Sequence, residues 1–173
     1  MKNIVLIGMS GTGKTTIGEE LSISLNMDFV DTDTLIENKT GISIEKIFSL
    51  YGEDYFRKLE SEIVRTIYQK KNQVISTGGG IVLNKDNIIK LKKNGVLVLL
   101  HASIDTIVKN IEKSKTVRPL LDSGEDTYLR VKSMYRNRKD MYLTYADIII
   151  SVEDKPINKI IYEILEKCVK INS

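Results

Sequence analysis

The amino-acid sequence predicts an α/β fold, in which a parallel sheet of five strands lies between two layers of helices. Short runs rich in Val and Ile alternate along the chain with longer segments of helical periodicity. Parallel strands require such crossover helices between them. The 173 residues and 42% hydrophobic content are enough for one buried core. We therefore predict a single three-layer α/β/α domain over residues 1–173.

Five segments have the character of buried strands, because each is a short apolar run bounded by glycine or polar residues. The clear strands are residues 4–7, 73–76, 95–100 and 147–152, and residues 28–30 form a weaker fifth. Ligands of such folds bind at the carboxyl ends of the strands. Functional residues are therefore expected just after these runs.

Helical periodicity occupies the segments between the strands. Pro156 suits the first turn of the last helix, where a missing N–H is tolerated. The expected helices cover residues 14–25, 43–70, 85–93, 103–113, 126–145 and 156–170.

The charges and the cysteine content exclude several classes of protein. The 26 basic and 23 acidic residues are dispersed, so no nucleic-acid or membrane footprint is indicated. No run approaches the roughly 20 apolar residues that span a bilayer. The single cysteine, Cys168, has no partner for an internal disulfide and indicates a reducing compartment. We expect a cytoplasmic monomer that binds neither nucleic acid nor membranes.

Residues 8–15 match the phosphate-binding pattern G-x-x-x-x-G-K-S/T between a predicted strand and a predicted helix. Glycines let backbone N–H groups converge on phosphate oxygens, Lys14 adds a positive charge, and Thr15 offers a hydroxyl to Mg²⁺. The pattern predicts binding of a nucleoside triphosphate with Mg²⁺. The predicted nucleotide-binding residues here are Gly11, Thr12, Gly13, Lys14, Thr15 and Thr16.

Two further clusters follow predicted strands. Asp31 and Asp33 flank Thr32, and strand alternation would point both carboxylates toward the phosphate site. One could hold Mg²⁺ through water and the other could accept a proton from a hydroxyl, although a helix N-cap explains them equally well. Residues 78–80 are three glycines, which suit either close approach of backbone to a small ligand or a tight connection to the next helix.

Arginines are few, so their placement is informative. Arg57 has Glu60 three residues later, which could orient its guanidinium for a bidentate carboxylate contact; a solvated helix arginine is the alternative. The polar segment around Arg118 and Pro119 is expected to form a mobile lid over about residues 112–125. A lid that closes over the phosphates excludes water, as a kinase requires; an ordinary surface loop is the alternative.

Together these residues resemble the shikimate kinases, a family among the nucleoside monophosphate kinase-like P-loop proteins. The resemblance extends from residue 4 to about residue 156 and implies a P-loop kinase fold with a substrate-binding helical segment at about residues 32–60. Its motifs are residues 8–16, Asp31-Thr32-Asp33, Phe56-Arg57 with Glu60, residues 78–80, Arg118-Pro119-Leu120-Leu121, and Arg138 with Tyr142 and Ala146-Asp147.

The resemblance implies an activity. The γ-phosphoryl group of ATP would pass to the 3-hydroxyl of shikimate, giving shikimate 3-phosphate and ADP in aromatic amino-acid biosynthesis. Positioning and charge neutralisation dominate such a transfer, and Lys14, Mg²⁺ and Arg118 would supply the positive charge. Arg118 would reach the phosphates from the lid, and Asp31 would hold Mg²⁺ through water.

The resemblance also assigns the acceptor side. Asp33 would bind ring hydroxyls and act as the base, Arg57 and Arg138 would hold the carboxylate, and a backbone N–H, foremost that of Gly79, would add a contact. The predicted catalytic residues are thus Lys14, Asp33 and Arg118; the substrate-binding residues are Asp33, Arg57, Gly78, Gly79, Gly80 and Arg138; the metal ligands are Thr15 and Asp31.

The sequence departs from the family pattern near the lid. The family often has an adenine-stacking arginine before the lid, and residues 110–113 contain none, which leaves Lys113 as a substitute. Arg136 competes with Arg138, although the spacing to Tyr142 favours Arg138. A gluconate kinase, a GTP-dependent switch and a non-catalytic binding protein are the alternative functions. The switch is disfavoured because no N-K-x-D segment follows Leu100.

Overall fold

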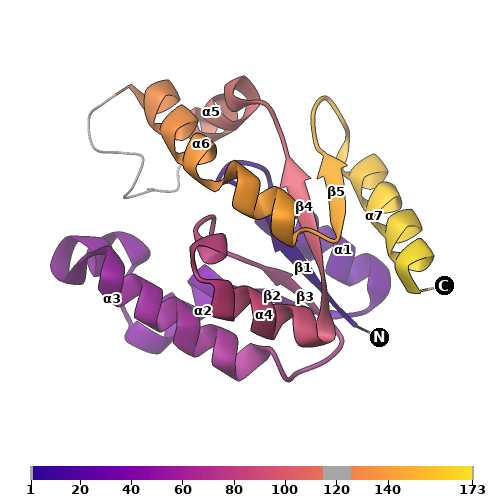
Figure 1. Ribbon diagram of the computed structural model, residues 1–173, viewed down its shortest axis with the longest axis horizontal. Helices are drawn as coiled ribbons and strands as arrows, with labels where there is room; N and C mark the ends of the chain where they lie inside the picture. Colours follow the sequence, from indigo (N-terminus) through magenta and orange to yellow (C-terminus); the bar gives the residue numbers. More distant parts are fainter. Residues whose placement is uncertain (1, 115–125, 173) are drawn as a thin grey trace.

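The structure, a computed structural model, describes residues 2–114 and 126–172. A five-stranded parallel sheet forms the central layer, in the order β2-β3-β1-β4-β5, with helices on both faces (Figure 1). The predicted fold class is therefore confirmed, including the weaker strand. The strands are β1 (Asn3–Ile7), β2 (Asp28–Asp31), β3 (Gln73–Ser76), β4 (Gly95–His101) and β5 (Ile148–Ser151).

The helices follow the predicted pattern with two differences. An additional helix, α2, occupies the segment after β2, and α3 is bent at Gly52, where φ is 78° and ψ is 176°. The helical elements are α1 (Lys14–Leu25), α2 (Thr32–Thr40), α3 (Ile44–Ile67), the 3₁₀ turn η1 (Ile81–Leu83), α4 (Lys85–Asn94), α5 (Ile104–Lys113), α6 (Thr127–Tyr145) and α7 (Ile157–Asn172).

Helix α2 begins at Thr32, directly after β2, as the helix N-cap alternative for Asp31 predicted. The Asp31 carboxylate accepts hydrogen bonds from the N–H groups of Asp33 at 3.0 Å and Thr34 at 3.3 Å, which is N-cap geometry. The chain therefore turns into a helix at Thr32. Strand alternation was the wrong basis for orienting Asp31 and Asp33, because Asp33 belongs to the first helical turn.

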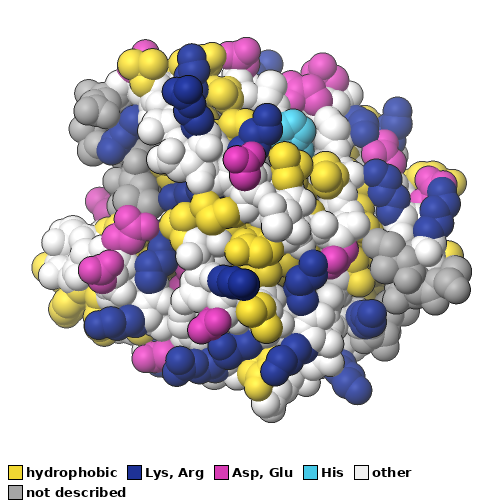
Figure 2. All heavy atoms as spheres, viewed as in Figure 1, with side chains coloured by type: hydrophobic (Ala, Val, Ile, Leu, Met, Phe, Trp, Pro, Cys, Tyr) yellow, Lys and Arg dark blue, Asp and Glu magenta, His cyan; other side chains and the backbone are white. Residues whose placement is uncertain are grey.

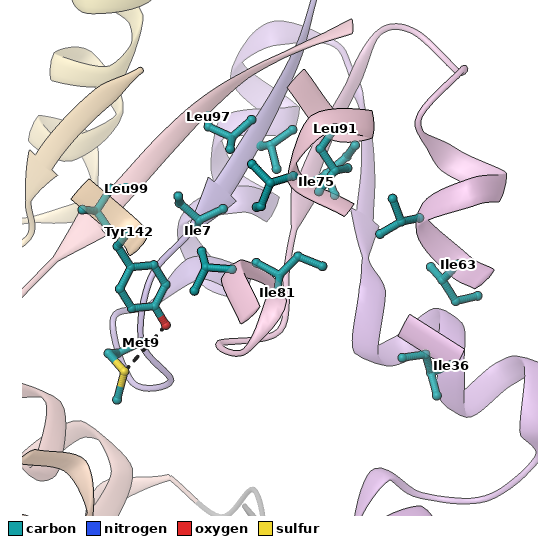
Figure 3. Close-up of a cluster of buried hydrophobic side chains, with 14 of the residues drawn as sticks. Ile7, Met9, Ile36, Ile63, Ile75, Ile81, Leu91, Leu97, Leu99 and Tyr142 are labelled. Atoms are coloured by element: carbon teal, nitrogen blue, oxygen red, sulfur yellow. Dashed lines mark hydrogen bonds between the residues drawn. The ribbon is translucent and has the colours of Figure 1, made fainter. Parts of the chain in front are cut away.

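Both faces of the sheet are buried, and successive residues of β1 show it. Val5 and Ile7 join a core that includes residues of α3, α4 and α6, part of which Figure 3 shows. Ile4 and Leu6 join a second core with residues of α1 and α7. Two-sided burial explains why the strands are continuous apolar runs.

The distribution of charged side chains on the surface agrees with their dispersed positions in the sequence. Basic side chains lie interspersed with acidic ones over the face shown in Figure 2. None of the helices in residues 2–114 and 126–172 combines the length and apolarity needed to cross a bilayer.

Candidate active site

The strand order brings three loops together at one edge of the sheet. Strand β3 lies between β1 and β2, so the phosphate loop, the glycine segment (residues 78–80) and the start of α2 are neighbours. They surround an open cavity of about 950 Å³. The predicted site residues that line it are Gly11, Gly13, Lys14, Thr15, Thr16, Asp31, Asp33, Arg57, Gly78, Gly79, Gly80 and Arg138.

Two predicted residues stand apart from this set. Thr12 is buried, and its hydroxyl donates to the Met9 carbonyl at 2.8 Å. Its side chain therefore braces the phosphate loop from within. Arg118 lies outside the described residues.

The phosphate loop has the backbone that its glycines permit. The φ angles of Gly8, Gly11 and Gly13 are 141°, 86° and 84°, values that residues with a Cβ rarely adopt. The Lys14 ammonium donates to the carbonyls of Gly8 and Met9 at 2.9 Å each. The lysine is thus folded over the loop, where phosphate oxygens can replace those carbonyls.

Thr15 and Asp31 meet at the rim of the cavity. The Thr15 hydroxyl donates to Asp31 Oδ2 at 3.0 Å, while Asp31 Oδ1 caps α2. No cluster of three His, Cys, Asp or Glu ligands exists among the described residues. One hydroxyl and one carboxylate fit Mg²⁺ that is bound mainly by water and phosphate oxygens.

Asp33 has a buried carboxyl oxygen that lacks a hydrogen-bond partner among the described residues of the site. Its Oδ1 is buried and has no hydrogen-bond partner among residues 2–114 and 126–172. Burial raises the pKa of Asp33 to about 7, and the negative charges of Asp31 and Glu60 act in the same direction. An unpaired buried carboxylate oxygen beside a cavity indicates a ligand hydroxyl as its partner.

Arg57 is held in one orientation by two carboxylates. Its guanidinium donates to Glu60 at 3.0 and 3.2 Å and to Glu53 at 2.9 and 3.2 Å, and it lies over the Phe56 ring. Glu60 is fully buried, and burial raises its pKa while Arg57 opposes that rise. Arg57 is therefore not the solvated helix arginine of the alternative interpretation.

The glycine segment is required for space, since none of its three residues has a positive φ. A Cβ on Gly80 would lie 2.2 Å from the Arg57 guanidinium, and one on Gly78 would lie 3.0 Å from both Asp33 and Glu60 carboxylate oxygens. The segment therefore allows the charged side chains to pack against backbone.

The hydrogen bonds of this segment show which of its N–H groups remain for a ligand. The Gly78 N–H donates to the Thr32 hydroxyl at 3.1 Å. The N–H groups of Gly79 and Gly80 have no acceptor within the described parts of the chain. The Gly78 N–H can donate to a ligand only if its hydrogen bond to Thr32 is broken.

Arg138 and Arg136 differ in position on α6. Arg138 is 7% exposed, lines the cavity, and donates to the Gly79 carbonyl at 3.3 Å. Arg136 is exposed and does not line the cavity. The spacing argument for Arg138 therefore selected the arginine that faces the site.

Sequence reasoning assigned no role to several residues of the site. Asn110 donates to the Gly11 carbonyl at 2.8 Å and lines the cavity beside Lys113. The Tyr142 hydroxyl donates to the Gly79 carbonyl. The missing arginine in residues 110–113 pointed toward the first of these, and the Arg138 to Tyr142 spacing toward the second.

The comparisons with known proteins agree with this geometry. The family model described as shikimate kinase matches residues 10–169. The chain belongs to the shikimate kinase family. Family members are small-molecule kinases that transfer phosphate from ATP to an alcohol, so the switch and non-catalytic alternatives are set aside.

Individual relatives cover almost the whole chain. A shikimate kinase of Caldanaerobacter subterraneus subsp. tengcongensis is 46% identical over 99% of this chain and 98% of its own. The structure of an Acinetobacter baumannii shikimate kinase in complex with shikimate has a TM-score of 0.93 at 30% identity, covering 98% of this chain and 94% of that one. A Sinorhizobium meliloti gluconokinase, 15% identical with a TM-score of 0.61 over 98% of this chain and 93% of that one, shares the fold alone.

Proposed function

We propose that this chain transfers the γ-phosphoryl group of ATP to the 3-hydroxyl of shikimate. The observation that carries the proposal is the convergence of a phosphate loop, two oriented arginines and a buried carboxyl on one cavity. Membership of the shikimate kinase family supports it. The same cavity thus holds a donor half and an acceptor half.

Charge selects the acceptor. Arg57 and Arg138 both line the cavity, and the carboxylates of Glu53 and Glu60 fix the Arg57 plane. A carboxylate on the acceptor would receive hydrogen bonds from both guanidinium groups, together with the N–H of Gly79 or Gly80. A neutral sugar leaves unmatched the guanidinium donors that Glu53, Glu60 and the Gly79 carbonyl do not occupy, which favours an anionic acceptor.

Asp33 is proposed as the base. Its ionised carboxylate accepts the proton of the acceptor hydroxyl as the hydroxyl oxygen bonds to the γ-phosphorus and the bond to the ADP oxygen breaks. A pKa of about 7 suits this role, because a base with a pKa near the working pH exists in its ionised form and still binds the proton.

The donor half neutralises phosphate charge. Backbone N–H groups of residues 11–16 face the phosphates, and Lys14 exchanges its present carbonyl partners for phosphate oxygens. Thr15 and Asp31 are the proposed holders of Mg²⁺, which offsets charge on the β- and γ-phosphates when bound. Arg118 is proposed to add a further positive charge, on the sequence pattern alone.

We also propose a cytoplasmic monomer that acts on small molecules and uses neither nucleic acid nor a membrane. The dispersed charges, the single cysteine and the interspersed surface charges support this.

A coupled assay tests the proposed function. The protein is offered ATP and Mg²⁺ with shikimate, gluconate or nucleoside monophosphates in parallel. We expect turnover with shikimate only. Turnover with gluconate and none with shikimate would overturn the proposal.

A further inference from the structure

Tyr142 connects helix α6 to the glycine segment through a buried hydrogen bond. The side chain is 2% exposed, and its hydroxyl donates to the Gly79 carbonyl. The same hydroxyl lies 3.7 Å from the Met9 sulfur of the phosphate loop, a contact drawn in Figure 3. The ring itself belongs to the apolar core that also contains Ile7 and Leu99. Tyr142 therefore contacts both the phosphate loop of the donor half and the glycine segment of the acceptor half.

The peptide groups around Gly79 are held from several sides. Arg138, one helical turn before Tyr142, donates to the same Gly79 carbonyl at 3.3 Å. The Thr32 hydroxyl accepts the Gly78 N–H at 3.1 Å, and the Gly78 carbonyl accepts the Ile81 N–H at 3.1 Å. Since a peptide group is planar, a fixed Gly79 carbonyl also fixes the direction of the Gly80 N–H.

A glycine segment needs such restraint more than other segments do. Glycine has the widest choice of backbone conformations, and three in a row can present their N–H groups in many directions. Gly79 and Gly80 line the cavity, and their N–H groups have no acceptor within the described parts of the chain. A donor that holds the Gly79 carbonyl removes this freedom before a ligand arrives.

We propose that Tyr142 is a positioning residue for the acceptor: its hydroxyl holds the Gly79 carbonyl and thereby fixes the direction of the Gly80 N–H, which shares that peptide group. The Gly79 N–H is held less directly, through the neighbouring Gly78 peptide. The assignment rests on the proposed function only in taking shikimate as the acceptor. The hydroxyl contacts backbone rather than ligand, so its effect passes through the glycine segment. Its effect is expected on acceptor binding more than on nucleotide binding.

The hydroxyl is suited to this role over the whole physiological pH range. Burial raises the pKa of Tyr142 to about 12, so the group stays protonated and remains a donor. Phenylalanine at this position would keep the ring packing and lose only the donor. The Gly79 carbonyl would then retain only the longer bond from Arg138.

The test compares Tyr142→Phe with Tyr135→Phe. Tyr135 lies on the same helix, and its hydroxyl contacts His101 Nδ1 at 3.4 Å, away from the glycine segment. For Tyr142→Phe we expect the KM for shikimate to rise about five- to tenfold, the size of one lost hydrogen bond. The KM for ATP should change by less than about twofold and Tm by less than about 4 °C. Tyr135→Phe should leave both KM values unchanged.

Amide NMR of the ligand-free protein gives a readout that does not depend on the substrate. We expect Tyr142→Phe to move the ¹H–¹⁵N signals of Gly79 and Gly80 and to speed their hydrogen exchange, with no such change in Tyr135→Phe. Thr32→Val, which frees the Gly78 N–H from the other side, should raise the KM for shikimate in the same way.

The possible outcomes separate the two proposals. Unchanged Gly79 and Gly80 signals, or an equal rise in the KM values for ATP and shikimate, would overturn the positioning role. Failure of the wild-type protein to phosphorylate shikimate would overturn the proposed function. The NMR comparison would still decide the positioning role in that case.

Discussion

The two halves of the cavity differ in the backbone conformation of their glycines. In the donor half, Gly11 and Gly13 have φ values of 86° and 84°, and a Cβ on Gly13 would meet only ordinary contacts at 3.4 Å. In the acceptor half, residues 78–80 have no positive φ, yet a Cβ on Gly80 would lie 2.2 Å from Arg57. The donor half needs an unusual backbone, and at Gly8 it also needs space, because a Cβ there would lie 2.4 Å from the Leu100 carbonyl oxygen. The acceptor half needs only the space.

This difference shows how each half is built. The phosphate loop of the donor half consists of consecutive residues, so its backbone geometry is largely local. The acceptor half is assembled from Asp33, Arg57, the glycine segment and Arg138, which lie far apart in the chain and on different elements. Substitutions in the donor half should therefore impair ATP binding, whereas substitutions in the acceptor half should impair acceptor binding or the chemical step.

The largest effect is expected from the buried carboxyl of the acceptor half. Asp33→Asn should lower kcat by about 10² to 10⁴ because the base is lost, while the ATP Kd measured by calorimetry stays within about twofold. Asp28→Asn, at the opposite end of β2 and exposed, is the matched control and should retain full activity. Undiminished turnover by Asp33→Asn would remove Asp33 from the chemistry.

A pair of alanine substitutions tests the roles of the glycines in the two halves. Gly80→Ala should displace the Arg57 guanidinium and raise the KM for shikimate by about 10- to 100-fold through loss of positioning. It should also lower stability, because the buried Glu60 carboxyl would lose its partner. Gly13→Ala should instead weaken ATP binding, because φ at this position is 84°.

Gly41→Ala is the control for backbone strain alone. Gly41 has φ 72° and nothing within 4 Å of its added Cβ, so the variant should lose about 1 kcal/mol of unfolding free energy and keep both KM values. The comparison between the halves fails if Gly80→Ala and Gly13→Ala impair the same substrate. Steady-state kinetics and urea unfolding provide the measurements.

A smaller effect is expected from Arg138 of α6, with Arg136 of the same helix as its control. Arg138→Lys keeps the charge but loses the bidentate fork, and the KM for shikimate should rise about tenfold, the size of a charged hydrogen bond. Arg136→Lys should change it by less than about twofold, since Arg136 is exposed and outside the cavity. Equal effects of the two variants would contradict the assignment of Arg138.

The last prediction concerns stability and pH. The pKa of Asp33 is raised from 3.8 to about 7 in the folded state, so the folded protein binds this proton more tightly than the unfolded chain. Linkage then requires that the contribution of Asp33 to the free energy of unfolding of the ligand-free protein falls as pH rises from about 4 to about 7. The raised pKa of Glu60 contributes a slope of the same sign.

Urea unfolding over this pH range measures the contribution of Asp33 as a difference. The decline with pH should be shallower in Asp33→Asn than in wild type, whereas Asp28→Asn should follow wild type. Parallel curves for Asp33→Asn and wild type would show that burial does not perturb this carboxyl.

The order of strands and helices could be predicted from the sequence because apolar runs and helical periodicity are local signals. Helix α2 was left open as one of two alternatives, because Asp31, which caps it, is also the last residue of β2. The role of the Thr12 side chain could not be predicted either, because its position in the motif does not give the side-chain direction. In the structure its hydroxyl donates a hydrogen bond to the Met9 carbonyl.

The sequence by itself determined the α/β class, the phosphate loop and the types of residue at the site. The strained backbone of that loop is encoded where it occurs, since glycine alone adopts such φ values readily. Only the tertiary structure decided that β3 lies between β1 and β2, which places the glycine segment beside both the phosphate loop and Asp33. It likewise decided that Arg138 faces the cavity and that Tyr142 holds Gly79. These are long-range contacts, and their geometry depends on how whole layers pack rather than on any local pattern.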